Sequence, residues 1–79
     1  MAIATEPIHD PYTDPEDLTP EQAAQVEKLR NYGCTVGWLP NGRIRVAPPG
    51  MTLDLNRGTG SERWQIAGIV MAVERKLFL

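Results

Sequence analysis

The chain has 79 residues, of which 42% are hydrophobic and 23% are charged, and its formal net charge is −2. This length allows one domain at most, and a chain this short hides only about 60% of the surface that its unfolded form exposes, so its core is marginal. One cysteine and one histidine exclude an intrachain disulfide and a Cys/His zinc cluster. We therefore expect no bound metal and no cofactor.

The expected compartment is the cytoplasm. The N-terminus has no basic region followed by an apolar core, which argues against a secretory signal. The longest uninterrupted apolar run, residues 66–73, is far shorter than the ~20 residues that a membrane-spanning helix needs. Together with the lone Cys34, these features predict a soluble protein of a reducing compartment without membrane contact.

The first 18 residues differ in composition from the rest. They hold five acidic residues, three prolines and no Lys or Arg, whereas residues 19–79 hold eight basic and five acidic residues. Such a segment cannot bury enough surface to offset the entropy lost on ordering. We predict a flexible acidic tail over residues 1–18 and a single domain over residues 19–79. Two alternatives are an acidic strand folded back over the basic body and a recognition segment anchored by Ile8, Tyr12 and Leu18.

The first helix has signals at both ends. Thr19 can cap the helix, Pro20 suits its first position, and Gln22 completes a capping box with Thr19. Gly33 suits the left-handed position that follows a helix. The pattern predicts a helix from Pro20 to about Tyr32.

A β-hairpin is predicted over residues 36–46 (VGWLPNGRIRV), and two registers are open. A two-residue turn at Asn41-Gly42 would place Trp38 on one face with Arg43 and Arg45, as an exposed stacking platform.

The second register has a type I turn at Pro40-Asn41 and a bulge at Gly42. We favour it because proline presets the backbone for that turn and because apolar and polar residues then alternate without exception. Trp38 would then oppose Ile44 as a core residue. The predicted inner face is Val36, Trp38, Ile44 and Val46, and the outer face is Thr35, Gly37, Arg43 and Arg45.

A third strand is predicted over residues 51–55, where Met51, Leu53 and Leu55 alternate with polar residues. The prolines at 48 and 49 must leave the sheet first, because proline cannot donate to a strand ladder. The fold class is thus α+β, a small two-layer α-β-β-β-α domain with a disordered acidic N-terminal tail.

The loop over residues 56–61 leads into the last helix. Thr59 or Ser61 could cap this helix. Arg57 and Arg63 beside a helix N-terminus could bind an anion, but no nucleotide-binding P-loop motif is present. A flexible connector explains these residues better.

The last helix, from about residue 61 to at least Lys76, carries too much apolar surface for a two-layer monomer. Ile66, Val70, Val73 and Leu77 form one stripe that should lie on the sheet. A second stripe remains outside, which predicts a partner, most simply a second copy of the chain. The predicted interface comprises Trp64, Gly68, Ile69, Met71, Ala72 and Phe78.

The order of elements resembles the double-stranded-RNA-binding topology. Within it, residues 29–47 (LRNYGCTVGWLPNGRIRVA) and residues 58–77 resemble HicA-type toxins of actinobacteria and their phages, which carry a helix ending in glycine, a short hairpin and a Gly-Thr element before the last helix. The resemblance implies an α-β-β-β-α fold, and the layout is similar to phage accessory proteins. In that family the hairpin carries a catalytic histidine after a Gly-Ser pair, whereas this chain has Asn41-Gly42-Arg43 there. RNA cleavage is therefore not implied.

An enzyme is the least expected class. Catalysis needs a nucleophile or an acid–base pair with an orienting partner, and none is evident for Cys34, Asp54 or His9.

Two functions remain. We favour a non-enzymatic protein-interaction module, an inhibitor or adaptor that acts through the last helix as a homodimer or on a host protein. The alternative is a catalytically inactive HicA-like or double-stranded-RNA-binding-domain-like module that contacts nucleic acid weakly. Its candidate phosphate contacts are Arg43, Arg45, Arg57 and Arg63.

Overall fold

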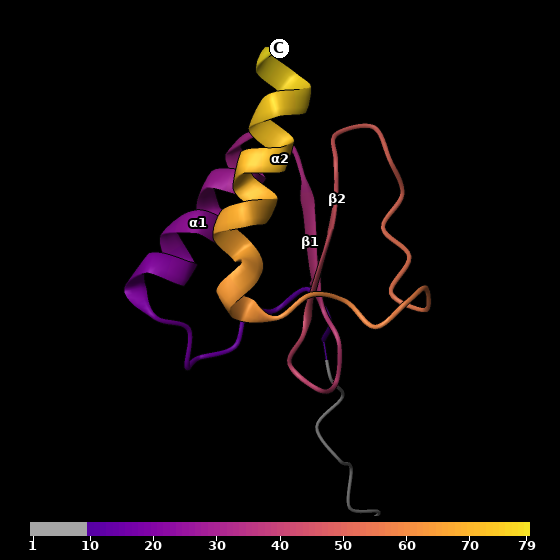
Figure 1. Ribbon diagram of the computed structural model, residues 1–79. Coiled ribbons are helices and arrows are strands. Elements are labelled where there is room, and N and C mark those ends of the chain that lie inside the picture. Colours follow the sequence, from indigo (N-terminus) through magenta and orange to yellow (C-terminus); the bar gives the residue numbers. More distant parts are fainter. Residues whose placement is uncertain (1–9) are drawn as a thin grey trace, which may run out of the picture.

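The structure is a computed structural model that describes residues 10–79. Its elements are α1 (Pro20–Asn31), β1 (Thr35–Trp38), β2 (Ile44–Ala47), the short 3-10 helix η1 (Arg63–Gln65) and α2 (Ile66–Phe78) (Figure 1). Two helices and an antiparallel pair of strands confirm the α+β class.

Helix α1 begins and ends as the sequence predicts. The Thr19 hydroxyl accepts from the Gln22 amide and the Gln22 side chain accepts from the Thr19 amide, both at 3.1 Å. The last helical residue is Asn31, Tyr32 is the C-cap and Gly33 follows with a φ of 90°. The capping box and the glycine stop are thus confirmed.

The hairpin adopts the bulged register. Trp38 pairs with Ile44, the Leu39 amide donates to the Arg43 carbonyl at 2.8 Å, and the Gly42 amide closes the turn onto the Leu39 carbonyl at 2.8 Å. Gly42 has a φ of 87°, a left-handed conformation that most residues avoid. Trp38 is only 1% exposed, so the prediction of a core tryptophan is confirmed and the stacking platform is wrong.

The predicted third strand is wrong. Residues 51–55 form no strand, and the sheet has two strands in the described part of the chain. Instead of joining the edge of the sheet, Leu53 and Leu55 lie over its outer face at Gly37, where a Cβ atom would come within 2.8 Å of both side chains. Gly37 is therefore buried, although the alternating pattern predicts that it faces water.

Ser61 pairs with the free edge of β2. It lies ten residues beyond the first residue of the predicted third strand. The Ile44 amide donates to the Ser61 carbonyl at 2.9 Å, and the Ser61 amide donates back at 2.8 Å. This single bridge brings the chain across the end of β2 just before α2 begins.

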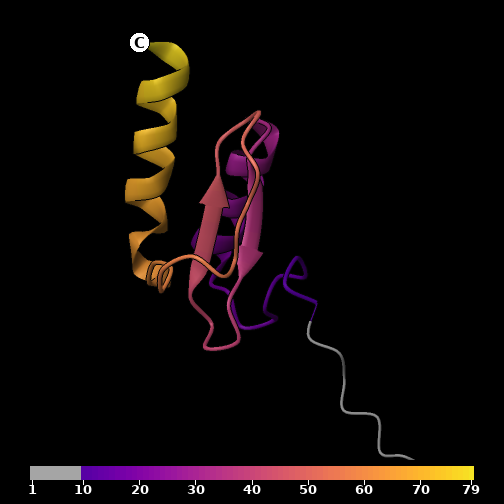
Figure 2. The ribbon, with the colours of Figure 1, turned by 90° about the vertical axis from the view of Figure 1, so that its right-hand side faces the viewer.

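The core lies between the helices and one face of the hairpin. Figure 2 shows α1 behind the two strands and the loop that follows β2 in front of them. The buried cluster draws on α1, both strands and α2, together with Cys34 at the start of β1; its members are Val26, Leu29, Cys34, Val36, Trp38, Ile44, Ile66, Val70 and Val73.

Helix α2 starts differently from the prediction. Neither Thr59 nor Ser61 caps it: Glu62 precedes η1, and its amide donates to the Gln65 side chain at 2.8 Å. The inner stripe is confirmed at Ile66, Val70 and Val73, which are buried. Leu77, in contrast, is 42% exposed. Figure 1 shows that the C-terminal turns of α2 extend past the end of the sheet.

Residues 10–18, which we name the acidic strap, require a correction to the predicted flexible tail. The Trp38 amide donates to the Pro11 carbonyl at 2.7 Å, and Leu18 packs against the core. Asp14 and Asp17 bind arginines of the domain, so their charge favours an ordered segment over a solvated one. This is the weighed alternative of an acidic strand folded over the basic body. Ile8 and His9 lie outside the described residues.

Candidate interaction surfaces

The side of α2 that faces away from the core is apolar and uncovered. Trp64 is 76% exposed, Met71 57% and Phe78 66%, and a Cβ atom added at Gly68 would have no atom within 4 Å apart from the local helix backbone. We call Trp64 of η1 together with Gly68, Met71 and Phe78 of α2 the outer ridge. These four of the six predicted interface residues lie where the helical spacing predicts.

The C-terminal end of the outer ridge is fastened to α1. The Phe78 ring meets the Tyr32 ring edge-on with centroids 5.5 Å apart. The Tyr32 hydroxyl donates to Glu74 at 2.6 Å, and Lys28 forms an ion pair with the same carboxylate at 3.2 Å. The Tyr32 hydrogen bond lowers the pKa of Glu74, and that same bond raises the pKa of Tyr32. The ridge is therefore presented by a helix held in place at its last turns.

The other two predicted interface residues, Ile69 and Ala72, belong to a separate hollow between β2 and α2. It has a volume of about 520 Å³ and is lined by Val46, Pro48, Ile69, Ala72, Val73, Arg75 and Lys76. A second hollow of about 340 Å³ continues from Val46 and Ile69 towards Arg45 and residues 58–61. We call the two together the β2–α2 groove.

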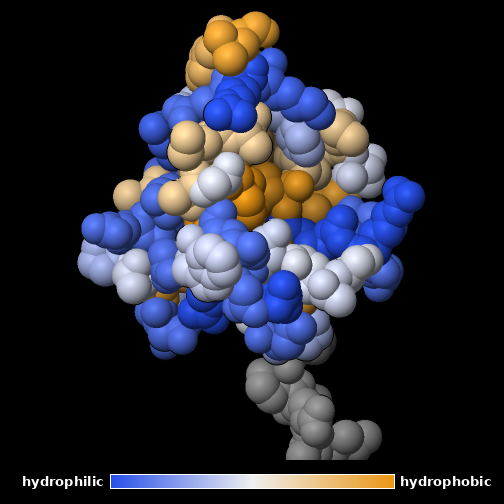
Figure 3. Space-filling model, viewed as in Figure 1, coloured by the Kyte–Doolittle hydropathy of each residue, from blue (hydrophilic) through white to orange (hydrophobic). Residues whose placement is uncertain are grey.

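Apolar surface is visible at the bottom of a depression between α2 and the loop that follows β2 (Figure 3). Hydrophilic residues lie around it in the same view. Ile69, which fits neither stripe in the sequence, is half-buried here and packs against the edge of the core. The predicted single interface is thus two surfaces on two sides of one helix.

Two of the four candidate phosphate contacts form ion pairs with acidic residues of the same chain. Arg43 forms an ion pair with Glu62 and also donates to the Gly60 carbonyl at 3.1 Å. Its charge is therefore largely matched before any ligand arrives.

Arg63 is engaged in the same way. It binds Asp17 at 2.9 Å and lies over the Trp38 ring at 5.7 Å from its centroid. Of the four candidates, Arg45 and Arg57 alone have no ion pair to any described residue. The structure does not present four free arginines as one patch.

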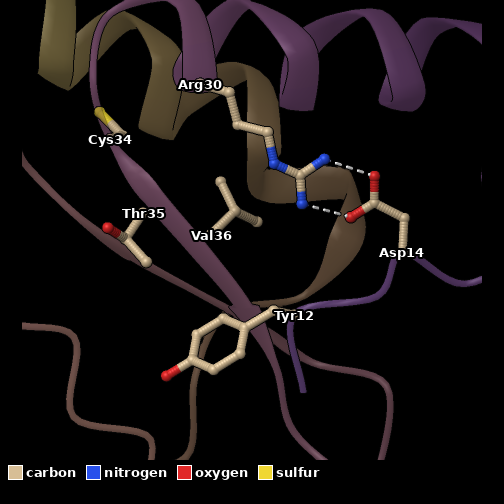
Figure 4. Close-up of a pocket in the computed structure, with 6 residues that line it drawn as sticks. All are labelled: Tyr12, Asp14, Arg30, Cys34, Thr35 and Val36. Atoms are coloured by element: carbon tan, nitrogen blue, oxygen red, sulfur yellow. Dashed lines mark hydrogen bonds and ion pairs between the residues drawn. The ribbon is translucent and has the colours of Figure 1, made fainter. Parts of the chain in front are cut away.

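The acidic strap closes over β1 and α1 beside a shallow pocket (Figure 4). Arg30 donates to both carboxylate oxygens of Asp14, at 2.7 and 2.8 Å, and the Trp38 indole donates to the same group at 3.0 Å. The hydrogen bonds from Arg30 are the main reason why the pKa of Asp14 is lowered. The strap therefore holds a charged carboxylate against the tryptophan of the core.

Cys34 lines this pocket from the other side, apart from Asp14 and Arg30 in Figure 4. It is 6% exposed, and burial raises the pKa of its thiol, which disfavours the reactive thiolate. Asp54 is exposed in the loop after β2, where it accepts from the Asn56 amide.

Within residues 10–79, no group of three His, Cys, Asp or Glu side chains lies close enough together to hold a metal ion. The helices of this part of the chain are also too short or too polar to cross a membrane.

Sequence reasoning weighed the strap only as an alternative to a flexible tail, and it missed the groove. Asp14 and Asp17 could have favoured that alternative, since two carboxylates three residues apart can reach two separated arginines. The groove had no local signal, because it depends on where Ser61 joins β2.

Comparison with protein-family models, curated proteins and solved structures finds no match for this chain. The resemblance to HicA-type toxins and phage accessory proteins therefore stays a prediction.

Proposed function

We propose that the protein is a small non-enzymatic interaction module that pairs with a second copy of itself through the outer ridge of α2. The observation that carries this proposal is the exposure of Trp64 and Met71 on either side of Gly68, to which no non-local atom comes close. Large apolar side chains grouped on one helix face are typical of protein interfaces.

The geometry of the ridge suits a symmetric contact. Gly68 has no side chain, so a second helix could approach closely at this point, and an antiparallel arrangement about a two-fold axis would bring Trp64 of each copy towards Met71 of the other. Each large apolar side chain fully buried in this way contributes about 1.5–3 kcal/mol. A host protein that offers a similar apolar helix is the alternative partner.

The alternative function, weak nucleic-acid binding by an inactive HicA-like module, is less well supported. Because Arg43 and Arg63 are matched by Glu62 and Asp17, only two of the four candidate phosphate contacts, Arg45 and Arg57, have no ion pair to a described residue. Two free arginines supply little of the charge on which such binding depends.

Replacing Met71 with aspartate tests the dimer. We expect the wild-type protein to have the mass of a dimer by light scattering after size exclusion and the Met71→Asp variant to have the mass of a monomer. Both should show the same helical circular dichroism, because Met71 is exposed. Ile69 is less suitable for this change because it packs on the core.

The matched control is Ala24→Asp, which adds the same charge to an exposed position of α1. This variant should remain a dimer. A monomeric wild-type protein at the highest attainable concentration would contradict the proposal, and retention of short RNA that is lost on Arg45→Ala and Arg57→Ala would favour the alternative.

A further inference from the structure

The edge of β2 that faces away from β1 is covered only in part. The amide and carbonyl of Ile44 point to this edge, where Ser61 binds both. Backbone groups alternate along a strand, so the amide and carbonyl of Val46, two residues on, point the same way. Neither group has a hydrogen-bond partner among the described residues. An open edge of this kind is a template for a further strand.

The floor beside this open edge is apolar. Val46 and Ile69 lie at the junction of the two hollows, and Pro48, Ala72 and Val73 extend the apolar lining along α2. A chain lying along β2 could therefore bond with the Val46 backbone and place alternate side chains against Val46 and Ile69. Two hollows that meet at Val46 and Ile69 beside an open strand edge suit an extended peptide better than a compact ligand.

The rim of the groove is positive at both ends. Arg45 lines one end, and Arg75 and Lys76 line the other. None of the three has an ion pair to a residue of the described part, whereas Lys28, Arg30, Arg43 and Arg63 each have one. Of the residues that line the two hollows, none is acidic, so the charge at the rim is unopposed locally.

From the open backbone, the apolar floor and the positive rim, we propose that the β2–α2 groove binds an extended segment of a partner protein that carries acidic residues on both sides of an apolar centre. The segment adds to β2 beyond Ser61 as a further strand. Its backbone bonds to Val46, and its acidic ends meet Arg45 at one end and Arg75 and Lys76 at the other. This surface lies on a different side of α2 from the outer ridge and does not require dimer formation.

The probe is an acetylated and amidated peptide of sequence Glu-Thr-Val-Thr-Val-Thr-Glu, added to the full 15N-labelled chain. We expect the amide resonances of Val46 and Ile69 to shift on titration, and we expect the Val46 amide to exchange with solvent more slowly in the complex. No shift of either resonance at about 1 mM peptide, a concentration that would reveal even weak binding, would overturn the proposal.

Two modified peptides test the backbone contact without altering the protein. Each is methylated at alternate backbone nitrogens, one at the even positions and one at the odd positions. The peptide in which methyl groups replace the N–H donors that face β2 should bind roughly tenfold more weakly than the parent. The peptide methylated at the other nitrogens should bind more nearly like the parent. Equal binding by all three peptides would overturn strand addition.

The charge contact is tested by Lys76→Glu, with Arg57→Glu as the matched control. Both side chains are exposed, neither has an ion pair within the described residues, and only Lys76 lines the groove. We expect Lys76→Glu to weaken peptide binding roughly three- to tenfold and Arg57→Glu to leave it unchanged. A peptide with Lys in place of both Glu residues should not bind. Equal binding of that peptide would overturn the acidic preference.

Three further outcomes would identify a different occupant of the groove or test its independence from the outer ridge. Contacts in the spectra of the free protein between residues 1–9 and Val46 would mean that the chain's own N-terminus fills the groove, and they would overturn a partner segment. Tighter binding of a ten-nucleotide oligothymidine than of the peptide, with the same shifts, would identify a nucleic-acid site instead. Peptide binding that persists in Met71→Asp would confirm that the groove acts independently of the outer ridge, whereas binding that disappears with the dimer would overturn this independence.

Discussion

Gly60 lies where the loop before α2 passes close to the hairpin. Its φ is 74°, and a Cβ atom at this position would lie 2.7 Å from the Leu39 side chain and 3.0 Å from the carbonyl oxygen of Ile44. That oxygen accepts from the Ser61 amide, so it cannot move away without loss of the bridge that holds the loop. One missing methyl group thus allows the chain to cross β2 and begin α2.

Replacing Gly60 with alanine should therefore destabilise the fold in two ways. The new Cβ atom would clash with its neighbours, and alanine disfavours the left-handed backbone. We expect the free energy of unfolding to fall by roughly 2–4 kcal/mol, of which about 1–2 kcal/mol comes from the left-handed backbone. The control is Gly50→Ala, because Gly50 has a φ of 80° but no atom within 4 Å of its Cβ position. Urea denaturation should show a smaller loss for the control, and equal losses would mean that the close approach has no cost.

At the scale of elements, the two helices start in different ways. Helix α1 uses the Thr19 hydroxyl as its cap, whereas Thr59, one of the two candidate caps of the last helix, makes no capping bond. We expect Thr19→Ala to lower the free energy of unfolding by about 1 kcal/mol and Thr59→Ala to change it by less than about 0.5 kcal/mol. Thermal unfolding of the two variants measures the contrast, and a larger loss for Thr59→Ala would contradict the assigned caps.

The features that could be predicted depend on residues close together in the chain. The capping box joins Thr19 to Gln22, and the hairpin register follows from Pro40 and Gly42, so each carries its own local signal. The same reasoning failed at Leu53 and Leu55, which do alternate as in a strand. Their burial depends on Gly37, a residue at least 16 positions away, and a pattern of alternation cannot distinguish the edge of a sheet from its face.

The same contrast between local and long-range contacts applies to the candidate interaction surfaces. Trp64, Met71 and Phe78 were predicted to be exposed because helical spacing alone separates them from the inner stripe. The pairing of Asp14 with Arg30 and of Asp17 with Arg63 spans 16 and 46 positions, so composition suggested a solvated tail instead. The open edge at Val46 was not predicted, because it exists only once Ser61 has taken the place beside Ile44.

At the scale of the whole molecule, the oppositely charged residues of the sequence form ion pairs that hold separate parts of the fold together. The acidic strap meets Arg30 of α1 and Arg63 of η1, while Glu74 of α2 meets Lys28 of α1. Hydrogen bonds from these partners and from Tyr32 lower the pKa of Asp14, Asp17 and Glu74 in the folded state. Each carboxylate therefore stabilises the fold when it is ionised.

The stability of the fold should decline in acid. A carboxyl group whose pKa is lowered by folding contributes its stability fully above its unfolded pKa, near 3.8 for aspartate, and loses it as the pH falls through the lower folded value. We expect the midpoint of thermal unfolding to be nearly constant between about pH 5 and 7 and to decrease below about pH 4.

Asp14→Asn should lower the midpoint at neutral pH and make its decrease in acid shallower, because the variant has no charge to lose at this position. The control is Asp54→Asn, since Asp54 is exposed and has no ion pair to a described residue. Its profile should follow that of the wild type. Identical acid profiles for Asp14→Asn and the wild type would mean that the strap contributes no charge-dependent stability.

The opposite placement of the two tryptophans gives the molecule a built-in pair of optical reporters. Trp38 is 1% exposed beneath Asp14, and Trp64 is 76% exposed on the outer ridge. In the Met71→Asp variant, which we expect to be a monomer, iodide in solution should quench the emission of Trp64 while leaving that of Trp38 almost intact. Contact at the ridge would then shift the quenchable emission to shorter wavelength, whereas release of the strap would shift the protected emission to longer wavelength. A single fluorescence titration can therefore distinguish a partner that covers α2 from one that displaces the strap.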